Sequence, residues 1–161
     1  MASDLRVRAA TSQDVPGVVE VWRNFMEFHR DLDPHHQRSD DGEVHIAAFV
    51  SAQLASDDAR LWICEKDAAI VGYCLARMSQ RPPVFKDRAY GEILDLAVEQ
   101  PDRRRGIGTA LVREALSWFA ERQARRVELR VSAFNKVGLA FWRKHGFRTH
   151  IEVMYRMRAE P

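Results

Sequence analysis

Arg103-Arg104-Arg105-Gly106-Ile107-Gly108-Thr109-Ala110-Leu111 is the most informative segment of the chain. It stands between a strand-like apolar segment and a segment with helical periodicity. Glycines at such a junction let the backbone approach a ligand closely, and the N–H groups of the first helical turn point towards whatever lies in the loop. Arginine side chains add charge-assisted hydrogen bonds to an anion. We therefore expect this junction to bind a phosphate or pyrophosphate group.

Two other phosphate-binding motifs do not fit this stretch. It lacks the Gly-Lys-Ser/Thr ending of a P-loop, and it has too few glycines for a dinucleotide-binding fingerprint, which would also open the chain rather than come late in it. Gly-x-Gly alone is a weak signal, so a plain strand-to-helix turn remains the alternative.

Hydrophobic periodicity on both sides of the junction predicts alternating strands and helices. Thr11-Ser12-Gln13-Asp14 matches a capping box ahead of the first helix, and the acidic segment 27–43 is expected to be mostly a connector. Several neighbouring strands are of hairpin type, which favours a mixed sheet flanked by helices. We expect strands at 5–8, 61–65, 70–78, 91–98 and 127–131 with one or two more in 147–157, and helices at 15–26, 46–54, 107–123 and 137–145.

Length and composition favour one globular domain over residues 1–161. The chain has 161 residues, of which 46% are hydrophobic and 30% charged, and no apolar run approaches the roughly 18 residues of a membrane helix. The N-terminal residues, 1–6, lack the shape of a signal peptide, so we expect a cytoplasmic protein. Cys64 and Cys74 lie in apolar stretches and are expected to be reduced core thiols.

Charge is unevenly distributed, although the net charge is only +2. Residues 103–130 hold eight arginines and three glutamates, whereas residues 27–43 hold six acids and two arginines. One interpretation is that the basic segment faces a polyanion and the acidic segment tolerates cations. The other is that both are solvated faces of helices.

Three blocks of the chain together resemble the GNAT superfamily of N-acetyltransferases. Arg103-x-x-Gly106-x-Gly108 fits the family signature Arg/Gln-x-x-Gly-x-Gly/Ala at a strand-to-helix junction. The resemblance continues through residues 92–98 before it and residues 135–147 after it, in the family's order. The first third of the chain matches only in the order of its elements.

The resemblance implies a fold and a donor. The fold is α/β (α+β), with a mixed, mostly antiparallel central sheet of six to seven strands, about four flanking helices and a splay between the fourth and fifth strands. Acetyl-CoA would lie in that gap, its pantetheine beside the backbone of Leu96, Ala97 and Val98, with no metal involved. Asn135 would contact it near the thioester unless it only caps a helix, and Lys136 or Arg143 would reach the outer phosphates. The remaining cofactor-binding residues implied are Arg103, Arg104, Arg105, Gly106, Ile107, Gly108, Thr109, Phe141 and Trp142.

Acetyl transfer to an amine needs a proton acceptor and an oxyanion donor. Glu92 matches the position of a glutamate base in some family members, the alternative being an exposed glutamate at a strand edge. Asp95 is expected on the opposite strand face unless a bulge intervenes. We expect the N–H of Val98 to bind the oxyanion. Trp142 replaces the family's tyrosine acid, so water or Tyr155 would protonate the leaving thiolate.

The acceptor pocket is expected from residues 27–43 and 81–90, which the family varies. Carboxylates and aromatic rings there would bind a cationic small-molecule or peptide amine, although a solvated helix end and loop fits the same residues. We predict no metal, because His35, His36 and His45 lack partners at ligand spacing. The acceptor-binding residues expected are Phe28, His29, Asp31 and Tyr90.

Two other functions are open at this point. A catalytically silent acyl-CoA-binding module would explain the missing tyrosine, and residues 103–130 would allow a nucleic-acid contact. The near-zero net charge argues against nucleic acid, and no membrane partner is expected. Surface aromatic residues, expected to include Trp118, are compatible with a homodimer.

Overall fold

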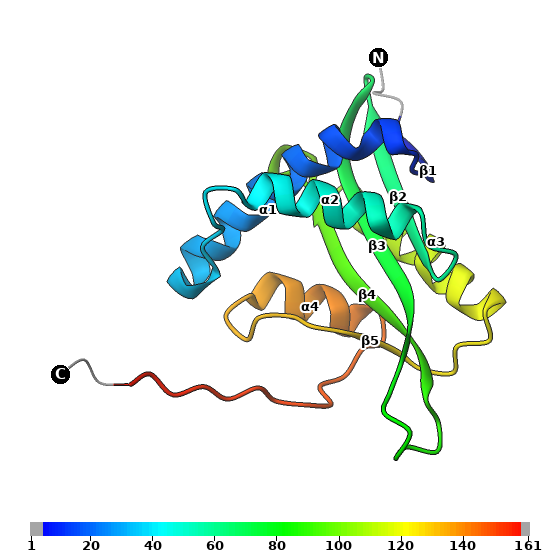
Figure 1. The fold of residues 1–161 in the computed structure, drawn as a ribbon. Helices are drawn as coiled ribbons and strands as arrows, with labels where there is room; N and C mark the ends of the chain where they lie inside the picture. Colours follow the sequence, from blue (N-terminus) through cyan, green and yellow to red (C-terminus); the bar gives the residue numbers. More distant parts are fainter. Residues whose placement is uncertain (1–4, 159–161) are drawn as a thin grey trace. The chain divides into compact units, whose positions relative to one another are not determined.

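A five-stranded sheet in the order β1-β2-β3-β4-β5 forms the centre of the computed structural model, which describes residues 5–158 (Figure 1). Neighbouring strands from β1 to β4 are antiparallel, and β5 pairs with β4 in parallel. The strands are β1 Leu5–Ala9, β2 Ala59–Lys66, β3 Ala69–Gln80, β4 Ala89–Val98 and β5 Val127–Leu129. The mixed, mostly antiparallel sheet is confirmed, but the expected six to seven strands are not found.

Contacts divide the chain into two units, Met1–Arg130 and Val131–Pro161, and each is described by itself. Within residues 5–158, the first unit contains the sheet, three α-helices and three short 3-10 helices, and the second contains α4. The α-helices are α1 Val15–Leu32, α2 Gly42–Leu54, α3 Ile107–Glu121 and α4 Lys136–Lys144, and the 3-10 helices are η1 Ser12–Asp14, η2 Pro34–His36 and η3 Gln100–Asp102.

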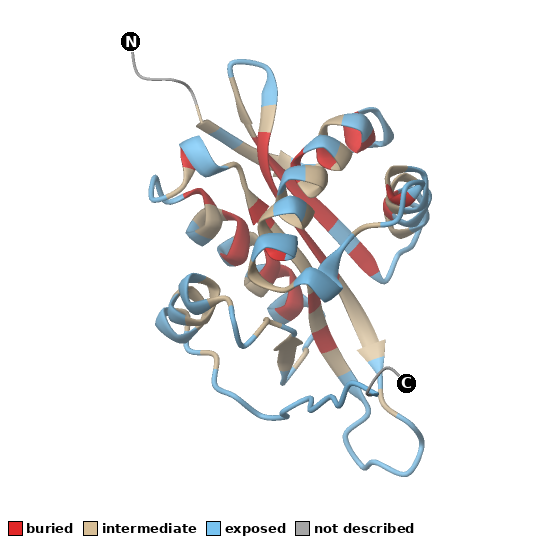
Figure 2. Cartoon of the chain, turned by 90° about the vertical axis from the view of Figure 1, so that its left-hand side faces the viewer, coloured by how far each residue is buried: buried red, intermediate tan, exposed pale blue. Residues whose placement is uncertain are grey.

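Helices α1 and α2 cover one face of the sheet, and α3 covers the other. Val18 and Val21 of α1 and Val50 of α2 are buried against inward side chains of the strands. The buried residues, red in Figure 2, accordingly lie where the helices face the sheet. On the other face, the ring of Trp118 lies 6.0 Å from that of Trp62 on β2. Trp118 is only 5% exposed, so the expectation that it adds to an aromatic surface is wrong.

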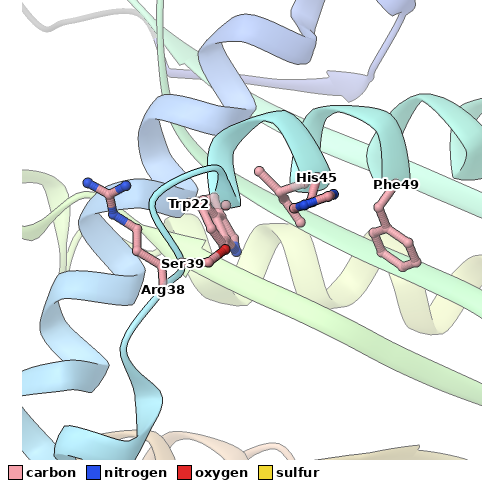
Figure 3. Close-up of a pocket in the computed structure, with 7 residues that line it drawn as sticks. Trp22, Arg38, Ser39, His45 and Phe49 are labelled. Atoms are coloured by element: carbon pink, nitrogen blue, oxygen red, sulfur yellow. The ribbon is translucent and has the colours of Figure 1, made fainter.

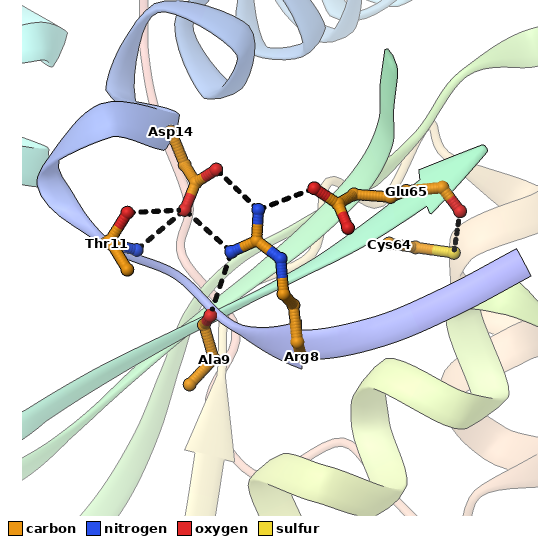
Figure 4. A network of polar contacts seen from close by, with 6 residues as sticks. All are labelled: Arg8, Ala9, Thr11, Asp14, Cys64 and Glu65. Carbon is orange, nitrogen blue, oxygen red and sulfur yellow. Dashed lines mark hydrogen bonds and ion pairs between the residues drawn. The ribbon is translucent and has the colours of Figure 1, made fainter. Parts of the chain in front are cut away.

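An arginine on β1 joins the first strand, the second strand and the start of α1 (Figure 4). Both terminal nitrogens of Arg8 donate to the Asp14 carboxylate at 2.8 Å, and Nη2 also donates to Glu65. The backbone N–H and the hydroxyl of Thr11 donate to Asp14 Oδ2 as well, at 2.7 and 3.0 Å. The predicted capping box is therefore present and is reinforced by an ion pair that sequence spacing does not reveal.

A β-bulge changes which β4 side chains share a face. Leu75 of β3 is opposite Asp95, but the next residue, Ala76, is opposite Ile93, so Leu94 is an extra residue on β4. Strict alternation would put Glu92 and Asp95 on opposite faces, and one extra residue puts them on the same face. The exception stated for Asp95, an intervening bulge, therefore applies, and Asp95 lies on the face of Glu92.

The pairing between β4 and β5 is short. It joins Gly91, Glu92 and Ile93 to residues 127–129 and ends there, whereas β4 continues to Val98. Within residues 5–158, no strand pairs with the β5-side edge of β4 beyond Ile93. This edge is open over the segment in which the resemblance implies a splay.

No strand forms in the predicted 147–157 segment of the second unit. Residues 147–158 are irregular, and the side chains of Ile151, Val153 and Tyr155 are exposed. Alternating apolar residues make a strand only where a neighbouring strand supplies hydrogen bonds, and the described residues supply none to this segment. This is why the strand count is lower than expected.

The first helix is longer than expected, and the cysteines are placed as expected. Helix α1 extends to Leu32, so Phe28, His29 and Asp31 lie on a helix rather than in a connector. Both cysteines are buried and unpaired, as expected. No helix among residues 5–158 is long and apolar enough to cross a membrane, and residues 1–4, used for the signal-peptide expectation, lie outside the described residues.

Candidate active site

The arginine-glycine junction forms a tight loop that leads directly into α3. Arg104 and Gly106 have positive φ angles of 65° and 84°, and α3 begins at Ile107. The N–H groups of the first turn of a helix have no carbonyl partner within that helix, and they carry the positive end of its dipole. The loop therefore places backbone donors around a position that suits an anion.

A buried carboxylate anchors this loop to the sheet. Asp102, 5% exposed, accepts hydrogen bonds from Lys66 Nζ on β2 at 2.7 Å and from Arg105 at 2.9 Å. The bond from Lys66 is the main cause that lowers the pKa of Asp102, so this group stays charged near neutral pH. Arg105 is thereby partly neutralised, and the loop backbone is fixed before any ligand arrives.

Arg103 connects the loop to both β4 and α1. Its Nε donates to the carbonyl of Val98 at 3.0 Å, and its guanidinium carbon lies 4.8 Å from the ring centroid of Phe28. Arg104 is exposed. The structure thus brings one predicted acceptor residue, Phe28, beside the predicted cofactor loop.

The end of β4 presents backbone groups on its open edge. The N–H of Glu99 donates to the carbonyl of Val71 at 2.8 Å, which makes these two residues a hydrogen-bonded pair across β4 and β3. Hydrogen-bonded and non-hydrogen-bonded pairs alternate in an antiparallel ladder, so the backbone groups of Val98 and Leu96 point away from β3. They face the edge that β5 does not reach.

Glu92 is held by groups on β3. Its Oε2 accepts hydrogen bonds from Arg77 Nε at 3.1 Å, from Arg77 Nη2 at 2.9 Å and from the Ser79 hydroxyl at 3.0 Å. Its side chain is 16% exposed. The carboxylate is therefore not the isolated strand-edge group of the alternative interpretation, but it already has a cationic partner.

Asp95 lies in a different environment on the same face. The hydroxyl of Tyr73, a buried residue on β3, donates to Asp95 Oδ2 at 3.2 Å. Burial raises the pKa of the Asp95 carboxyl to about 6, and the Tyr73 hydrogen bond opposes that rise. Strand alternation alone places Asp95 away from Glu92, and a single sequence carries no clear signal for the bulge that brings them to one face.

The other predicted acceptor residues lie on α1 and β4, and the ring centroid of His29 is 5.3 Å from that of Phe28. His29 is buried, its Nδ1 lies 3.0 Å from the carbonyl of Phe25, and burial lowers its pKa. Asp31 is exposed and pairs with the neighbouring Arg30 at 2.9 Å. Tyr90 lies on β4, with the guanidinium carbon of Arg81 5.3 Å from its ring centroid. The ring of Phe28 contacts Arg103 of the loop, and the charge of Arg103 also contributes to the lowered pKa of His29.

A pocket that sequence reasoning missed lies between α1 and the start of α2 (Figure 3). It has a volume of about 310 Å³, and its wall is mainly apolar with a basic end at Arg38. Spacing gives no signal for it, because its residues come from two helices and the loop between them. The lining residues are Trp22, Arg38, Ser39, Gly42, His45, Ile46 and Phe49.

The second unit contains the remaining predicted residues. Asn135 caps α4, its side-chain oxygen accepting from the N–H of Gly138 at 2.8 Å. The rings of Phe141 and Trp142 meet edge to face at 5.1 Å, and Trp142 also contacts Phe147 at 5.2 Å. Tyr155 is exposed. Capping and packing roles are thus present, and contacts of these residues with a donor remain predictions.

A family comparison matches this arrangement. The sequence model of the acetyltransferase (GNAT) family matches residues 19–147, which include β2 to β5 and α2 to α4. The chain belongs to the GNAT acetyltransferase family. Within residues 5–158 of this GNAT chain, no group of three histidine, cysteine or acidic side chains is arranged to hold a metal ion.

Individual relatives agree with the family. An uncharacterized N-acetyltransferase of Methanocaldococcus jannaschii is 26% identical over 141 residues, which cover 88% of this chain and 59% of the relative. The GNAT chain spans less than two thirds of the length of the curated relatives it matches.

Solved structures share the fold. A variant of the BH1408 protein of Bacillus halodurans has a TM-score of 0.86 at 24% identity, covering 96% of this chain and 99% of that one. A predicted acetyltransferase of Clostridium acetobutylicum, solved with acetyl-CoA, has a TM-score of 0.76 at 20% identity, covering 96% of each chain.

Proposed function

We propose that the chain is an N-acetyltransferase that moves an acetyl group from acetyl-CoA to a primary amine. The observation that carries the proposal is the open β4 edge at Leu96 and Val98 followed directly by a helix N-terminus within an anchored, arginine-rich loop. A donor with amide groups at one end and a pyrophosphate at the other matches both features in this order.

The donor would be bound mainly by backbone groups. The pantetheine amides would pair with Leu96 along the open edge of β4, as an added strand would, and the N–H of Val98 would donate to the thioester carbonyl. The pyrophosphate would accept hydrogen bonds from the loop and the first turn of α3, residues 103–109. Asn135, Phe141 and Trp142 are proposed as further contacts from the second unit.

The chemistry would proceed by direct attack in a ternary complex. The amine nitrogen, as a neutral nucleophile, attacks the thioester carbonyl, and the N–H of Val98 stabilises the oxyanion that forms. Collapse restores the C=O bond and breaks the C–S bond, and the thiolate of CoA takes one proton. Two β4 carboxylates, Glu92 and Asp95, are the candidates for accepting the proton that the substrate ammonium loses first.

The acceptor would bind on the face covered by α1 and α2. Phe28 and Tyr90 offer aromatic rings there, and His29 and Asp31 belong to the same proposed region. The apolar pocket beside Trp22 and Arg38 suits an uncharged portion of the acceptor. This composition fits a small molecule or a peptide that carries its amine on an apolar or aromatic frame.

The proposal is tested by calorimetric binding of acetyl-CoA and by CoA release against a panel of small amines and short peptides. We expect binding, and CoA release only when an accepted amine is present. Binding without release for any amine would support the catalytically silent acyl-CoA-binding module instead. Absence of binding would overturn both.

Two matched glycine variants test the loop. Gly106 and Gly146 have nearly equal φ angles of 84° and 86°, and an added Cβ would meet nothing within 4 Å at either. Gly106→Ala and Gly146→Ala should therefore be strained to a similar degree. We expect only Gly106→Ala to weaken acetyl-CoA binding. If the loop must take up about 1.4 kcal/mol of strain to reach its binding conformation, the affinity falls by about tenfold. Equal weakening in both variants would contradict the assigned role of the loop.

A further inference from the structure

The bulge at Leu94 places two carboxylates on one face of β4 in unlike surroundings. Glu92 is opposite Arg77, and Asp95 is opposite Leu75, one bulge further along the same two strands. Both side chains lie on the face that carries Tyr73 and Leu75, which pack under α1 and α2. The proposed acceptor face therefore has two acids, and the reaction needs only one proton acceptor.

Glu92 is the less suitable of the two for accepting a proton. Arg77 donates twice to its Oε2, and Ser79 donates to the same atom. Taking up a proton there would discharge one partner of an ion pair and leave the partly buried guanidinium without its counter-ion. These contacts hold the carboxylate in one position beside Arg77.

Asp95 has the features that Glu92 lacks. Its hydrogen-bond partner is the neutral hydroxyl of Tyr73, on a residue that is 1% exposed and therefore rigidly positioned. Burial disfavours the charged carboxylate and raises its pKa to about 6, a value at which the group is mostly ionised at neutral pH yet accepts a proton readily.

The other ionisable groups on the elements around Asp95 do not neutralise it. Cys74, its neighbour on β3, has a pKa that is raised by burial, so its thiol is uncharged. Arg77 is engaged by Glu92, and α1, which packs on this face, contributes the buried His29 with its lowered pKa. Glu128 of β5, opposite Glu92, is paired with Arg81 and Arg126.

We propose that Asp95 is the catalytic base and that Glu92, held by Arg77, is a positioning residue that orients the acceptor ammonium. This assignment rests on the proposed function. One proton passes from the ammonium to the Asp95 carboxylate, the resulting amine forms the C–N bond, and collapse of the tetrahedral intermediate then breaks the C–S bond. The second ammonium proton goes to the leaving thiolate, and Asp95 returns its proton to solvent, so one proton is released per turnover.

The test compares Asp95→Asn, Glu92→Gln and Tyr73→Phe in pH profiles of kcat/KM, all with one accepted amine. We expect Asp95→Asn to lose at least about 100-fold in kcat, a typical contribution of a general base, with acetyl-CoA affinity retained. Glu92→Gln should mainly raise KM for the amine. Tyr73→Phe should keep most activity and move the acidic limb of the profile to higher pH, because it removes the bond that stabilises the ionised carboxylate.

Two results would overturn the assignment while leaving acetyl transfer intact. One is an acidic limb of the kcat/KM profile that does not move in Tyr73→Phe, and the other is an unchanged kcat in Asp95→Asn. Failure of the wild-type protein to release CoA would instead count against the proposed function.

Folding gives an independent readout, since the raised pKa of Asp95 favours the folded state below about pH 4 and this benefit disappears as the pH rises through 6. The melting temperature of wild type should therefore fall relative to that of Asp95→Asn between pH 4 and 8, and parallel curves would contradict a partly buried carboxylate that ionises in this range.

Discussion

At the scale of single residues, Gly91 sets how closely α3 approaches the sheet. A Cβ added at Gly91 would lie 2.5 Å from Cδ1 and 2.6 Å from Cε1 of Phe119, whose ring is 1% exposed. These contacts are shorter than real Cβ atoms show, and a buried ring cannot move aside without disturbing its neighbours. The absence of a side chain at this position is therefore a packing requirement.

We predict that Gly91→Ala destabilises the fold by about 1–3 kcal/mol, as overpacking of a filled core does. Urea unfolding followed by circular dichroism measures the change in the free energy of unfolding. Phe119→Leu supplies the control, because the double variant should lose less stability than the sum of the two single variants. Strict additivity would show that the glycine is not limited by the ring.

At the scale of elements, the junction between β4 and α3 depends on a contact with β2. Asp102 on η3 joins Lys66 to Arg105, so a residue 36 positions earlier in the chain fixes the loop. The arginine run alone suggests three free cations, yet Arg103 and Arg105 are each held by the protein. The backbone, rather than the arginine forks, is left as the main donor to an anion.

We predict that Asp102→Asn lowers the affinity for acetyl-CoA several-fold, because the anchor of the loop is weakened before binding. Its effect on stability should be about 1–3 kcal/mol, the cost of leaving Lys66 without its charged partner. Calorimetry and urea unfolding measure the two quantities. Lys66→Met should weaken binding similarly, and adding it to Asp102→Asn should cost little more; full additivity would exclude coupling through this ion pair.

At the scale of the whole molecule, stability in acid depends on the junction of β1, β2 and α1. The two hydrogen bonds from Arg8, aided by those from Thr11, lower the pKa of Asp14 to about 2. The folded state therefore holds this carboxylate charged more strongly than the unfolded chain, in which its pKa is about 3.9. The stabilisation is fully present above about pH 5 and is lost as the pH falls through 4 towards 2.

We predict that wild type is more stable than Asp14→Asn by about 2 kcal/mol at pH 7, and that this difference shrinks between pH 5 and 2. Urea unfolding at several pH values measures it. Glu65→Gln, which removes only the second carboxylate on Arg8, should have a smaller effect. A difference that stays constant down to pH 2 would exclude the ion pair as its cause.

Much of the fold was predictable because its signals are local. The hairpin of β2 and β3, the cap ahead of α1 and the glycine loop before α3 each follow from residues a few positions apart. The 147–157 segment was not predictable in this way, because a strand needs a partner whose presence its own alternation does not encode. The same holds for the candidate site. Its loop could be predicted because the residues are adjacent in sequence, whereas the Glu92–Arg77 ion pair could not, because it joins two strands.

Residue types at short spacing were enough to predict the family, the order of the elements and the junction suited to a pyrophosphate. Which of the two β4 carboxylates has no cationic partner is visible only in the folded chain. Leu94 becomes a bulge through the register of β4 against β3, and that one extra residue brings Asp95 onto the face of Glu92 and within hydrogen-bond distance of the Tyr73 hydroxyl. Register is set by packing across the whole sheet, so no short stretch of sequence contains it.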